Sequence, residues 1–259
     1  MSRLGELRAE VVGRFAREAL ALGEGEVCAL FRRSYYLRFP RERYACVGDA
    51  SLGRGPLNAL VTGSAVPAIG DRILVSTQNA TLWTPSPLAG SGSSSLRGLT
   101  GAAVTRVPGE GLGCLILGKH NALAIHAQPA LEALERWLVG NTLDGEAEQL
   151  IGLGPGLTPS GDDYFGGVLL ALRACARASQ AESLWRWLKP RLPKRTSAIS
   201  AAHLAAAAEG EAHEALHLCL ENLFGTAGSW DEALERLGRV GHCSGWDGLA
   251  GACAVARIA

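Results

Sequence analysis

The chain has 259 residues, of which 47% are hydrophobic and 19% charged, a composition typical of one large or two ordinary globular domains. Its 25 basic and 25 acidic residues leave no formal net charge, which argues against the strongly basic surface of a nucleic-acid or membrane-surface protein. The seven cysteines include no C-x-x-C pair, and no apolar run reaches the roughly 18 residues of a membrane span. The first residues alternate charged and apolar side chains, unlike a signal peptide. We therefore expect a cytoplasmic chain with reduced thiols and no nucleic-acid or membrane partner.

The N-terminal half is predicted to be rich in β-strands. An apolar stripe from Leu4 to Leu22 has helical spacing and predicts one helix, which ends at Gly23. Beyond it, turn residues separate a series of short β-prone runs: EVCALF (26–31), YYLRF (35–39), YACVG (44–48), NALVTG (58–63), DRILVST (71–77), ATLW (80–83), GCLILG (113–118) and NALAIH (121–126). A Gly- and Ser-rich segment, 87–101, interrupts these runs and is either a surface loop or a flap over an active site.

The C-terminal half is predicted to be helical from about Gln128 onward. Proline or a polar residue begins each of its apolar-periodic segments, and glycine ends several of them: 129–140, 162–178, 183–192, 196–225, 229–241 and 244–259. Strands followed by helices, rather than alternating with them, indicate an α+β fold. We predict a β-rich domain with an N-terminal helix over residues 1–128 and a helical domain over 129–259.

The stretch GLGPGLTPSGDD, residues 152–163, marks the start of a predicted helix. Thr158, which precedes a proline, or Ser160, followed three residues later by Asp163, has the pattern of a helix N-cap. In either case Asp162 and Asp163 lie in the first turn, where the helix dipole favours negative charge. One interpretation is therefore structural: a capped helix entered through a tight Gly-Pro-Gly turn.

The same stretch is also a candidate phosphate site. Glycines at 152, 154 and 156 allow positive φ angles and close backbone approach, and free N–H groups at a helix start bind anions. Asp162 and Asp163 project about 100° apart on a helix, so one of them would cap while the other faces a ligand directly or through Mg²⁺. The candidate phosphate ligands in this stretch are Gly154, Gly156, Thr158, Ser160 and Gly161.

A second stretch repeats the pattern. SGDDYFGG (160–167) and SGWDGLAG (244–251) share Ser, Gly, Asp and Gly at the same offsets. Two helix starts with the same cap would explain the repeat. Alternatively, the two helices begin side by side around one pocket, in which the candidate catalytic residues are Asp162, Asp163, Asp247 and His242 and a further substrate ligand is Ser244. A lone histidine is more often structural, so both roles stay open for His242.

A third stretch, PKRTSAIS (193–200), supplies further candidate ligands. Another predicted helix start carries Lys194, Arg195, Thr196, Ser197 and Ser200, and a positive pair with hydroxyls there suits a phosphate or a carboxylate; Arg195, Thr196 and Ser197 are the candidate ligands. A solvated helix cap is the alternative interpretation.

A fourth stretch, HEALH (213–217), matches the zinc-protease pattern H-E-x-x-H on a predicted helix. Such sites need a third ligand, and Glu232 or Glu235 lies at an approximate spacing for one. We expect neither the secretion signal nor the upstream strand that accompany this pattern. A zinc hydrolase is therefore the weaker alternative.

Three motifs together resemble a bacterial family of domains of unknown function that includes the H subunit of the oxamate carbamoyltransferase of the allantoin pathway. They are LIGLGPGLTPSGDDYFGGVLLALR (150–173), RTSAISAAHLAAAAEG (195–210) and GHCSGWDGLAGA (241–252), in that order. The resemblance is loose over the β-rich half, where length and strand pattern alone agree.

This resemblance implies a subunit of a three-component transferase, which works with two other subunits on a small-molecule substrate. The implied reaction converts oxalurate and phosphate, or a related ureido acid and phosphate, into oxamate or its counterpart and carbamoyl phosphate. The resemblance does not say which subunit is catalytic. A non-catalytic subunit that binds phosphate or another ligand is the main alternative. Apart from Mg²⁺, no cofactor is expected.

Overall fold

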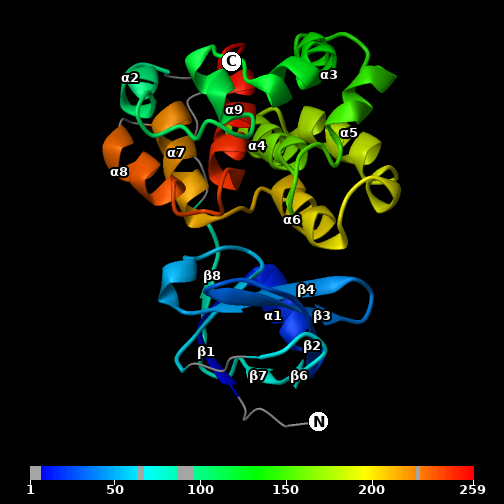
Figure 1. Cartoon of the computed structure of the whole chain (residues 1–259), viewed down its shortest axis with the longest axis vertical. Helices are drawn as coiled ribbons and strands as arrows, with labels where there is room; N and C mark the ends of the chain where they lie inside the picture. Colours follow the sequence, from blue (N-terminus) through cyan, green and yellow to red (C-terminus); the bar gives the residue numbers. More distant parts are fainter. Residues whose placement is uncertain (1–6, 64–66, 87–95, 226–227) are drawn as a thin grey trace. The chain divides into compact units, whose positions relative to one another are not determined.

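The computed structural model describes residues 7–63, 67–86, 96–225 and 228–259, which form two compact units (Figure 1). Unit 1 comprises Met1–Ser86 with Glu211–Glu214, and unit 2 comprises Pro87–Gly210 with Ala215–Ala259. Unit 1 holds the strands and unit 2 holds most of the helices, which confirms the predicted α+β fold.

Unit 1 is built on one sheet, whose strands confirm the runs predicted between residues 26 and 83. The strands are β1 (Leu7–Gly13), β2 (Gly25–Leu30), β3 (Ser34–Phe39), β4 (Arg43–Gly48), β5 (Asn58–Val61), β6 (Arg72–Ile73), β7 (Val75–Ser76) and β8 (Thr81–Trp83). Their order is β6-β2-β3-β4-β5-β1-β7, and β8 pairs with β1. Neighbours β2, β3 and β4 are antiparallel, whereas β4 and β5 are parallel.

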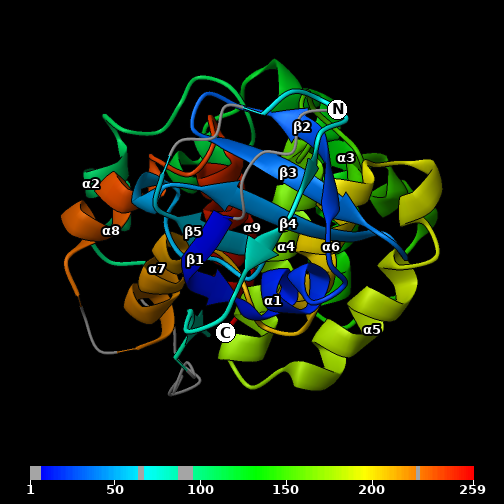
Figure 2. The same ribbon diagram turned by 90° about the horizontal axis from the view of Figure 1, so that it is seen from below.

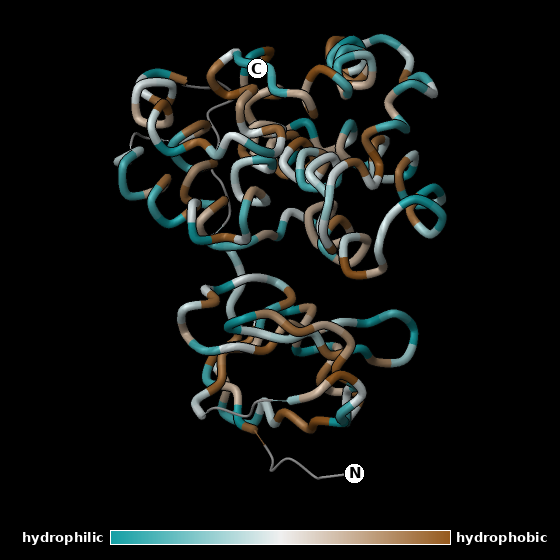
Figure 3. The backbone as a smooth tube through the Cα atoms, viewed as in Figure 1, coloured by the Kyte–Doolittle hydropathy of each residue, from teal (hydrophilic) through white to brown (hydrophobic). Residues whose placement is uncertain are grey.

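The core of unit 1 lies between this sheet and the short helix α1 (Arg14–Leu20), which Figure 2 shows beside the strands. Ala16 and Ala19 of α1 are fully buried, as are Val27 and Leu37 of the sheet. In Figure 3 brown stretches recur among white and teal ones in unit 1, and the β3–β4 turn with its charged residues is teal. Strands β4 and β5 are buried over almost their whole length, whereas β1 and β2 mix buried and exposed positions.

The predicted helix over residues 4–22 is wrong in its first half. Leu7–Gly13 forms strand β1, and the helix begins at Arg14. β1 pairs with β5, β7 and β8, which are contacts distant in sequence that local spacing does not reveal. Gly13 is the last residue of β1, and a Cβ there would lie 2.0 Å from the Gly55 carbonyl oxygen, so the close approach requires glycine.

Unit 2 is helical and contains the helices predicted after Gln128, except that the segment predicted over 196–225 is divided into two helices by a break at residues 209–213. The α-helices are α2 (Leu99–Ala103), α3 (Ala122–Leu138), α4 (Ser160–Ala174), α5 (Ala178–Leu188), α6 (Ala198–Ala208), α7 (Glu214–Phe224), α8 (Trp230–Leu237) and α9 (Ser244–Ala256). Short 3-10 helices are η1 (Ala50–Leu52), in unit 1, and η2 (Gly113–Leu117), η3 (Gly145–Leu150) and η4 (Leu192–Lys194). Within the described ranges, no helix has the length and apolar character needed to cross a bilayer.

The division between the units, at Ser86 and Pro87, lies earlier than the boundary predicted at 128/129. Two of the predicted strands are wrong: GCLILG forms η2, and NALAIH forms the start of α3. Short apolar runs have no diagnostic periodicity, so strand and helix could not be told apart there. Of the predicted loop, residues 87–95 lie outside the described structure, and Leu99–Ala103 forms α2.

The start of α3 shows what the sequence interpretation overlooked. Asn121 is its N-cap and accepts a hydrogen bond from the Ala124 N–H at 2.9 Å. Pro129, which we predicted to begin a helix, instead lies inside α3. The polar cap, rather than the proline, sets this boundary.

Helices α4 and α9 pack closely along their length (Figure 1). A Cβ on Gly167 of α4 would lie 1.8 Å from the Gly248 carbonyl oxygen, and a Cβ on Gly251 of α9 would lie 2.0 Å from the Tyr164 carbonyl oxygen. The backbones therefore touch where the repeated motif supplies its last glycine. This contact brings together the two helix starts, which carry the candidate site.

Candidate active site

The starts of α4 and α9 lie side by side, as the repeated motif predicted. The hydroxyl oxygens of Thr158 and Ser244 are 3.0 Å apart. Ser244, on α9, hydrogen-bonds the Asp163 carboxyl on α4, and Ser160, on α4, hydrogen-bonds the Asp247 carboxyl on α9. Each serine of the repeat thus binds the aspartate of the other helix, and the four side chains cross between the helices.

The serines make these contacts because neither helix uses a side-chain cap. The N-cap of α4 is Pro159, whose carbonyl accepts hydrogen bonds from two first-turn N–H groups. The N-cap of α9 is Cys243, again without a side-chain hydrogen bond. The predictions that Thr158 or Ser160 caps α4 are therefore wrong, and their hydroxyls are left for other partners.

Asp162 is buried, and it links the segment 152–159 before α4, the glycine loop, to α6. Its Oδ1 accepts from the Gly152 N–H at 2.8 Å, and its Oδ2 accepts from the Ser200 hydroxyl at 2.7 Å and from the Thr196 hydroxyl. Burial raises the pKa of Asp162 above its usual value, and the three donors oppose that shift. With three hydrogen bonds, this carboxyl is already saturated by the fold.

Asp247 is equally buried and fastens the segment before η2 to α9. Its Oδ1 accepts from the backbone N–H groups of Leu112 at 2.6 Å and Gly113 at 3.0 Å. Burial raises the pKa of Asp247 to about 6, against the hydrogen bonds from Ser160 and these two N–H groups. This carboxyl also has a structural function, which the sequence did not indicate.

Asp163 differs from both neighbours. The Ser244 and Thr158 hydroxyls favour its charged form, but its Oδ2 atom is buried and, within the described residues, has no hydrogen-bond partner. Burial, with the nearby charges of Asp247 and Asp162, raises the pKa of Asp163 well above its usual value. The partners of the three aspartates are hydroxyl and N–H groups rather than cations, so a proton is the simplest neutralisation for Asp163.

The glycine loop before α4 has the backbone conformation that its composition predicted. Gly152, Gly154 and Gly156 have φ angles of +75°, +109° and +94°. Gly152 is pressed against the Arg195 carbonyl oxygen, and a Cβ on Gly154 would lie 3.0 Å from the Ser160 nitrogen. Around Gly156 there is open space for a side chain. The loop therefore curls over the start of α4 with one exposed glycine.

The N–H groups of this loop divide into used and unused donors. Gly152 donates to Asp162, and Gly161 donates to the Leu153 carbonyl at 2.9 Å. No acceptor within the described residues takes the N–H of Gly154 or of Gly156. Of the predicted phosphate ligands, Gly161 is a packing residue, whereas these two glycines keep donors available.

The start of α6 supports the loop rather than offering a separate site. Ser197 caps α6 by accepting from the Ser200 N–H at 2.9 Å, which agrees with the alternative interpretation of this stretch as a helix cap, and donates to the Leu157 carbonyl at 2.5 Å. The Arg195 guanidinium pairs with Glu148 at 2.7 Å. Arg195 is therefore directed to a surface ion pair and not to the aspartates.

His242 lies outside the crossed side chains. Its Nε2 pairs with Glu110 Oε2 at 3.0 Å, and both side chains are 78% exposed. Burial and the charges of Asp247 and Glu110 raise the pKa of the neighbouring Cys243 thiol to about 11. Across the described ranges, Glu110, His242 and Cys243 are the one group whose three candidate metal-ligand atoms lie within 4.8 Å of one another. The aspartates form no such group.

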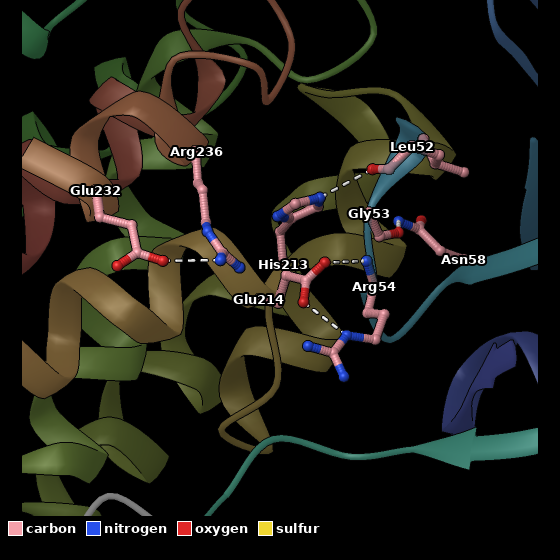
Figure 4. Close-up of polar contacts among 8 residues, drawn as sticks. All are labelled: Leu52, Gly53, Arg54, Asn58, His213, Glu214, Glu232 and Arg236. Carbon is pink, nitrogen blue, oxygen red and sulfur yellow. Dashed lines mark hydrogen bonds and ion pairs between the residues drawn. The ribbon is translucent and has the colours of Figure 1, made fainter. Parts of the chain in front are cut away.

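The HEALH residues are engaged elsewhere (Figure 4). His213 precedes α7, and its Nε2 lies 3.0 Å from the Leu52 carbonyl oxygen. Glu214 binds Arg54 twice, from the backbone N–H at 2.8 Å and from Nε at 2.6 Å. These contacts explain why residues 211–214 belong to unit 1.

Both glutamates that we expected as a third zinc ligand form ion pairs with arginines instead. Glu232 pairs with Arg236 at 2.8 Å, as Figure 4 shows, and Glu235 pairs with Arg239 at 2.6 Å. No three-ligand group in the described part of the chain includes a HEALH residue. The zinc-protease geometry that the motif suggested is absent from those residues.

Several contributors to this site were missed. Leu112 and Gly113 bind Asp247 through backbone N–H groups, which leave no side-chain signal. Ser200 was named at the predicted start of α6, but its hydrogen bond to Asp162 was not foreseen because it crosses between helices. The glycine-rich GEGLG (109–113) was the available clue, because Gly111 has a φ of +74° and packs against Asp247.

Comparison with known proteins gives one family. Residues 150–256 match the family model described as oxamate carbamoyltransferase subunit AllH. The match spans the glycine loop, α4, α6 and α9, and it confirms the resemblance predicted from the three motifs. No solved structure matches the chain.

Proposed function

We propose that this chain, whose residues 150–256 match the AllH family model, is a subunit of a carbamoyltransferase complex with two partner subunits. The proposed reaction is the phosphorolysis of oxalurate, or of a related ureido acid, to oxamate or its counterpart and carbamoyl phosphate. The family match carries the proposal. The glycine loop and Asp163 support a part in the chemistry itself.

The glycine loop is the proposed site for phosphate or carbamoyl phosphate. Gly154 and Gly156 keep unused N–H groups in a loop of positive φ angles, the type of backbone concavity that binds anions. The hydroxyls of Thr158 and Ser244 add donors beside Asp163. Thr196 and Ser197 contribute indirectly, by holding the loop and Asp162 in place.

Asp163 is the proposed general acid. When the C–N bond of a ureido acid breaks, the departing amide nitrogen takes up a proton, while a phosphate oxygen forms the new bond to the carbamoyl carbon. Burial raises the pKa of Asp163, so its carboxyl keeps a proton to higher pH than an exposed aspartate does, and Oδ2 has no hydrogen-bond partner among the described residues. Asp162 and Asp247 are positioning residues in this scheme.

A protonated Asp163 also removes an electrostatic obstacle. Three ionised carboxylates would repel phosphate, whereas a neutral carboxyl donates a hydrogen bond to it. Phosphate should therefore bind with uptake of protons and more weakly as the pH rises. Mg²⁺, which favours one or two carboxylates plus phosphate oxygens, would enter with the phosphate.

Isothermal titration with phosphate and with carbamoyl phosphate tests the loop. Gly156→Val should abolish binding, because valine rarely adopts the positive φ of +94° that this position requires. Gly140→Val is the matched control, since Gly140 has a φ of +107° with open space around it and lies after α3, outside the loop. Equal binding by both variants, or no binding by the unmodified protein, would remove the loop from the site.

A non-catalytic ligand-binding subunit is the second candidate, favoured by the structural saturation of Asp162 and Asp247. If the subunit is non-catalytic, it should bind phosphate within the complex, and turnover should not depend on Asp163. Activity of the three-subunit mixture, measured with and without this chain, distinguishes an accessory subunit from a required one.

A further inference from the structure

The side chains of Glu110, His242 and Cys243 converge beside the start of α9. Their candidate ligand atoms, a carboxylate oxygen, an imidazole nitrogen and a thiol sulfur, lie within 4.8 Å of one another. The proposed carbamoyl transfer uses none of the three. Oxygen, nitrogen and sulfur donors in one group form the mixed set that zinc accepts.

The backbone around Glu110 is held on both sides. The Asn121 amide donates to the Gly109 carbonyl at 3.0 Å and to the Gly111 carbonyl at 2.7 Å. This one side chain therefore bridges the residues before and after Glu110. The glutamate is placed beside His242 by a fixed backbone, although its side chain is exposed.

The two other ligands are placed by the start of α9. A Cβ on Gly111 would lie 2.9 Å from the Cys243 Cβ and 2.5 Å from Asp247 Oδ1, so the two segments are in direct contact. Asp247 joins them by accepting the Leu112 N–H and by donating its own N–H to the Cys243 carbonyl at 2.9 Å. The backbone segments that carry Glu110, His242 and Cys243 are therefore held together by the fold itself.

We propose that Glu110, His242 and Cys243 form a zinc-binding site with three protein ligands and a fourth position open to water or to a ligand oxygen. Binding forms a Zn–S bond to Cys243 and releases the thiol proton to solvent, because the thiolate is the ligand. The Glu110 carboxylate, 3.0 Å from His242 Nε2, supplies negative charge to the bound cation. The site is independent of HEALH and of the proposed transferase reaction.

Cobalt(II) is the probe, because it replaces zinc and reports a sulfur ligand through a thiolate-to-metal charge-transfer absorption. The full chain, stripped with a chelator, should bind one cobalt with this absorption, and zinc should displace it. Cys243→Ser should lose the absorption. His242→Ala and Glu110→Gln should each weaken binding by about 100-fold or more, since even outer-shell partners of metal ligands change affinity by 10–100-fold.

Two further variants serve as matched controls for the loss of the absorption in Cys243→Ser. Cys28→Ser removes another partly exposed thiol, in unit 1, and His217→Ala removes a histidine of HEALH; both should keep the absorption. Circular dichroism confirms that Cys243→Ser stays folded. Absence of the charge-transfer band in the unmodified chain, or its persistence in folded Cys243→Ser, would overturn the zinc site and leave the transferase proposal untouched.

Discussion

At the scale of single residues, three neighbouring aspartates divide into two structural residues and one with an unused carboxyl oxygen. Asp162 and Asp247 each accept three hydrogen bonds and fasten separate segments together, whereas Asp163 keeps one buried oxygen without a partner in the described residues. Sequence alone placed all three in one group. It could not rank them, because the distinction depends on backbone N–H groups and on hydroxyls that come from other helices.

Two substitutions of Asp247 should separate the contribution of its hydrogen bonds to stability from that of its charge. Asp247→Ala leaves the buried N–H groups of Leu112 and Gly113 without an acceptor, and each unsatisfied group costs about 1–3 kcal/mol. Asp247→Asn keeps an oxygen for both N–H groups, so its cost should be about 1 kcal/mol or less. Urea unfolding of both variants measures this difference. Equal losses would mean that charge, rather than hydrogen bonding, holds Asp247 in place.

The raised pKa of Asp163 predicts a pH-dependent stability of definite sign. Below the usual aspartate pKa both folded and unfolded states are protonated, and its full contribution is present; as the pH rises toward the folded pKa, the unfolded state loses its proton first and stability falls. Asp163→Asn lacks this titration, so its stability relative to the unmodified protein should increase with pH.

Asp49→Asn is the control of opposite sign. The Ser51 hydroxyl lowers the pKa of Asp49, so its contribution is present above the usual aspartate pKa and is lost as the pH falls. Thermal melts across the acid-to-neutral range compare the three proteins. A difference between Asp163→Asn and the unmodified protein that stays constant with pH would contradict the raised pKa.

At the scale of elements, the contact between α4 and α9 decides the geometry of the site. The repeated Ser-Gly-x-Asp-x-x-x-Gly spacing predicted this contact because it offered hydroxyl, carboxyl and a small residue in the same order on two helices. The structure adds the reason for the last glycine: its Cα faces the carbonyl of the other helix. The crossed serine–aspartate bonds follow from that close approach.

Gly167→Ala or Gly251→Ala should force the helices apart. A methyl group would lie 1.8 Å or 2.0 Å from a carbonyl oxygen, so each variant should lose roughly 3 kcal/mol or more, the upper part of the range for overpacking. Gly166→Ala, on the same helix, meets nothing closer than 3.8 Å and should be neutral or slightly stabilising. Chemical denaturation of the three variants tests the contact.

The double variant adds a second check. Gly167→Ala and Gly251→Ala should be less than additive, because one separation of α4 from α9 relieves both clashes. Additive losses would show that the two positions are strained independently, and the close crossing would then not be a single feature.

At the scale of the whole molecule, the sequence predicted the α+β order and most elements from periodicity and turn residues. It failed where pairing or capping is decided by distant residues: β1 depends on three other strands, and η2 depends on Asp247. It also failed for residues 211–214, whose ion pairs place them in unit 1. The conformation of the loop at 152–163 was predicted correctly because glycine adopts positive φ angles more readily than other residues, so the positions of its glycines indicate them.

Asp163 is proposed to supply the proton in a carbamoyltransferase complex. The direct measurement is the formation of carbamoyl phosphate from oxalurate and phosphate by the complex reconstituted with its two partner subunits. With Asp163→Asn, phosphate should still bind, because the amide also donates a hydrogen bond, while turnover should fall by about 10²–10⁴-fold. Turnover equal to that of the unmodified complex, from a folded and assembled Asp163→Asn protein, would contradict it.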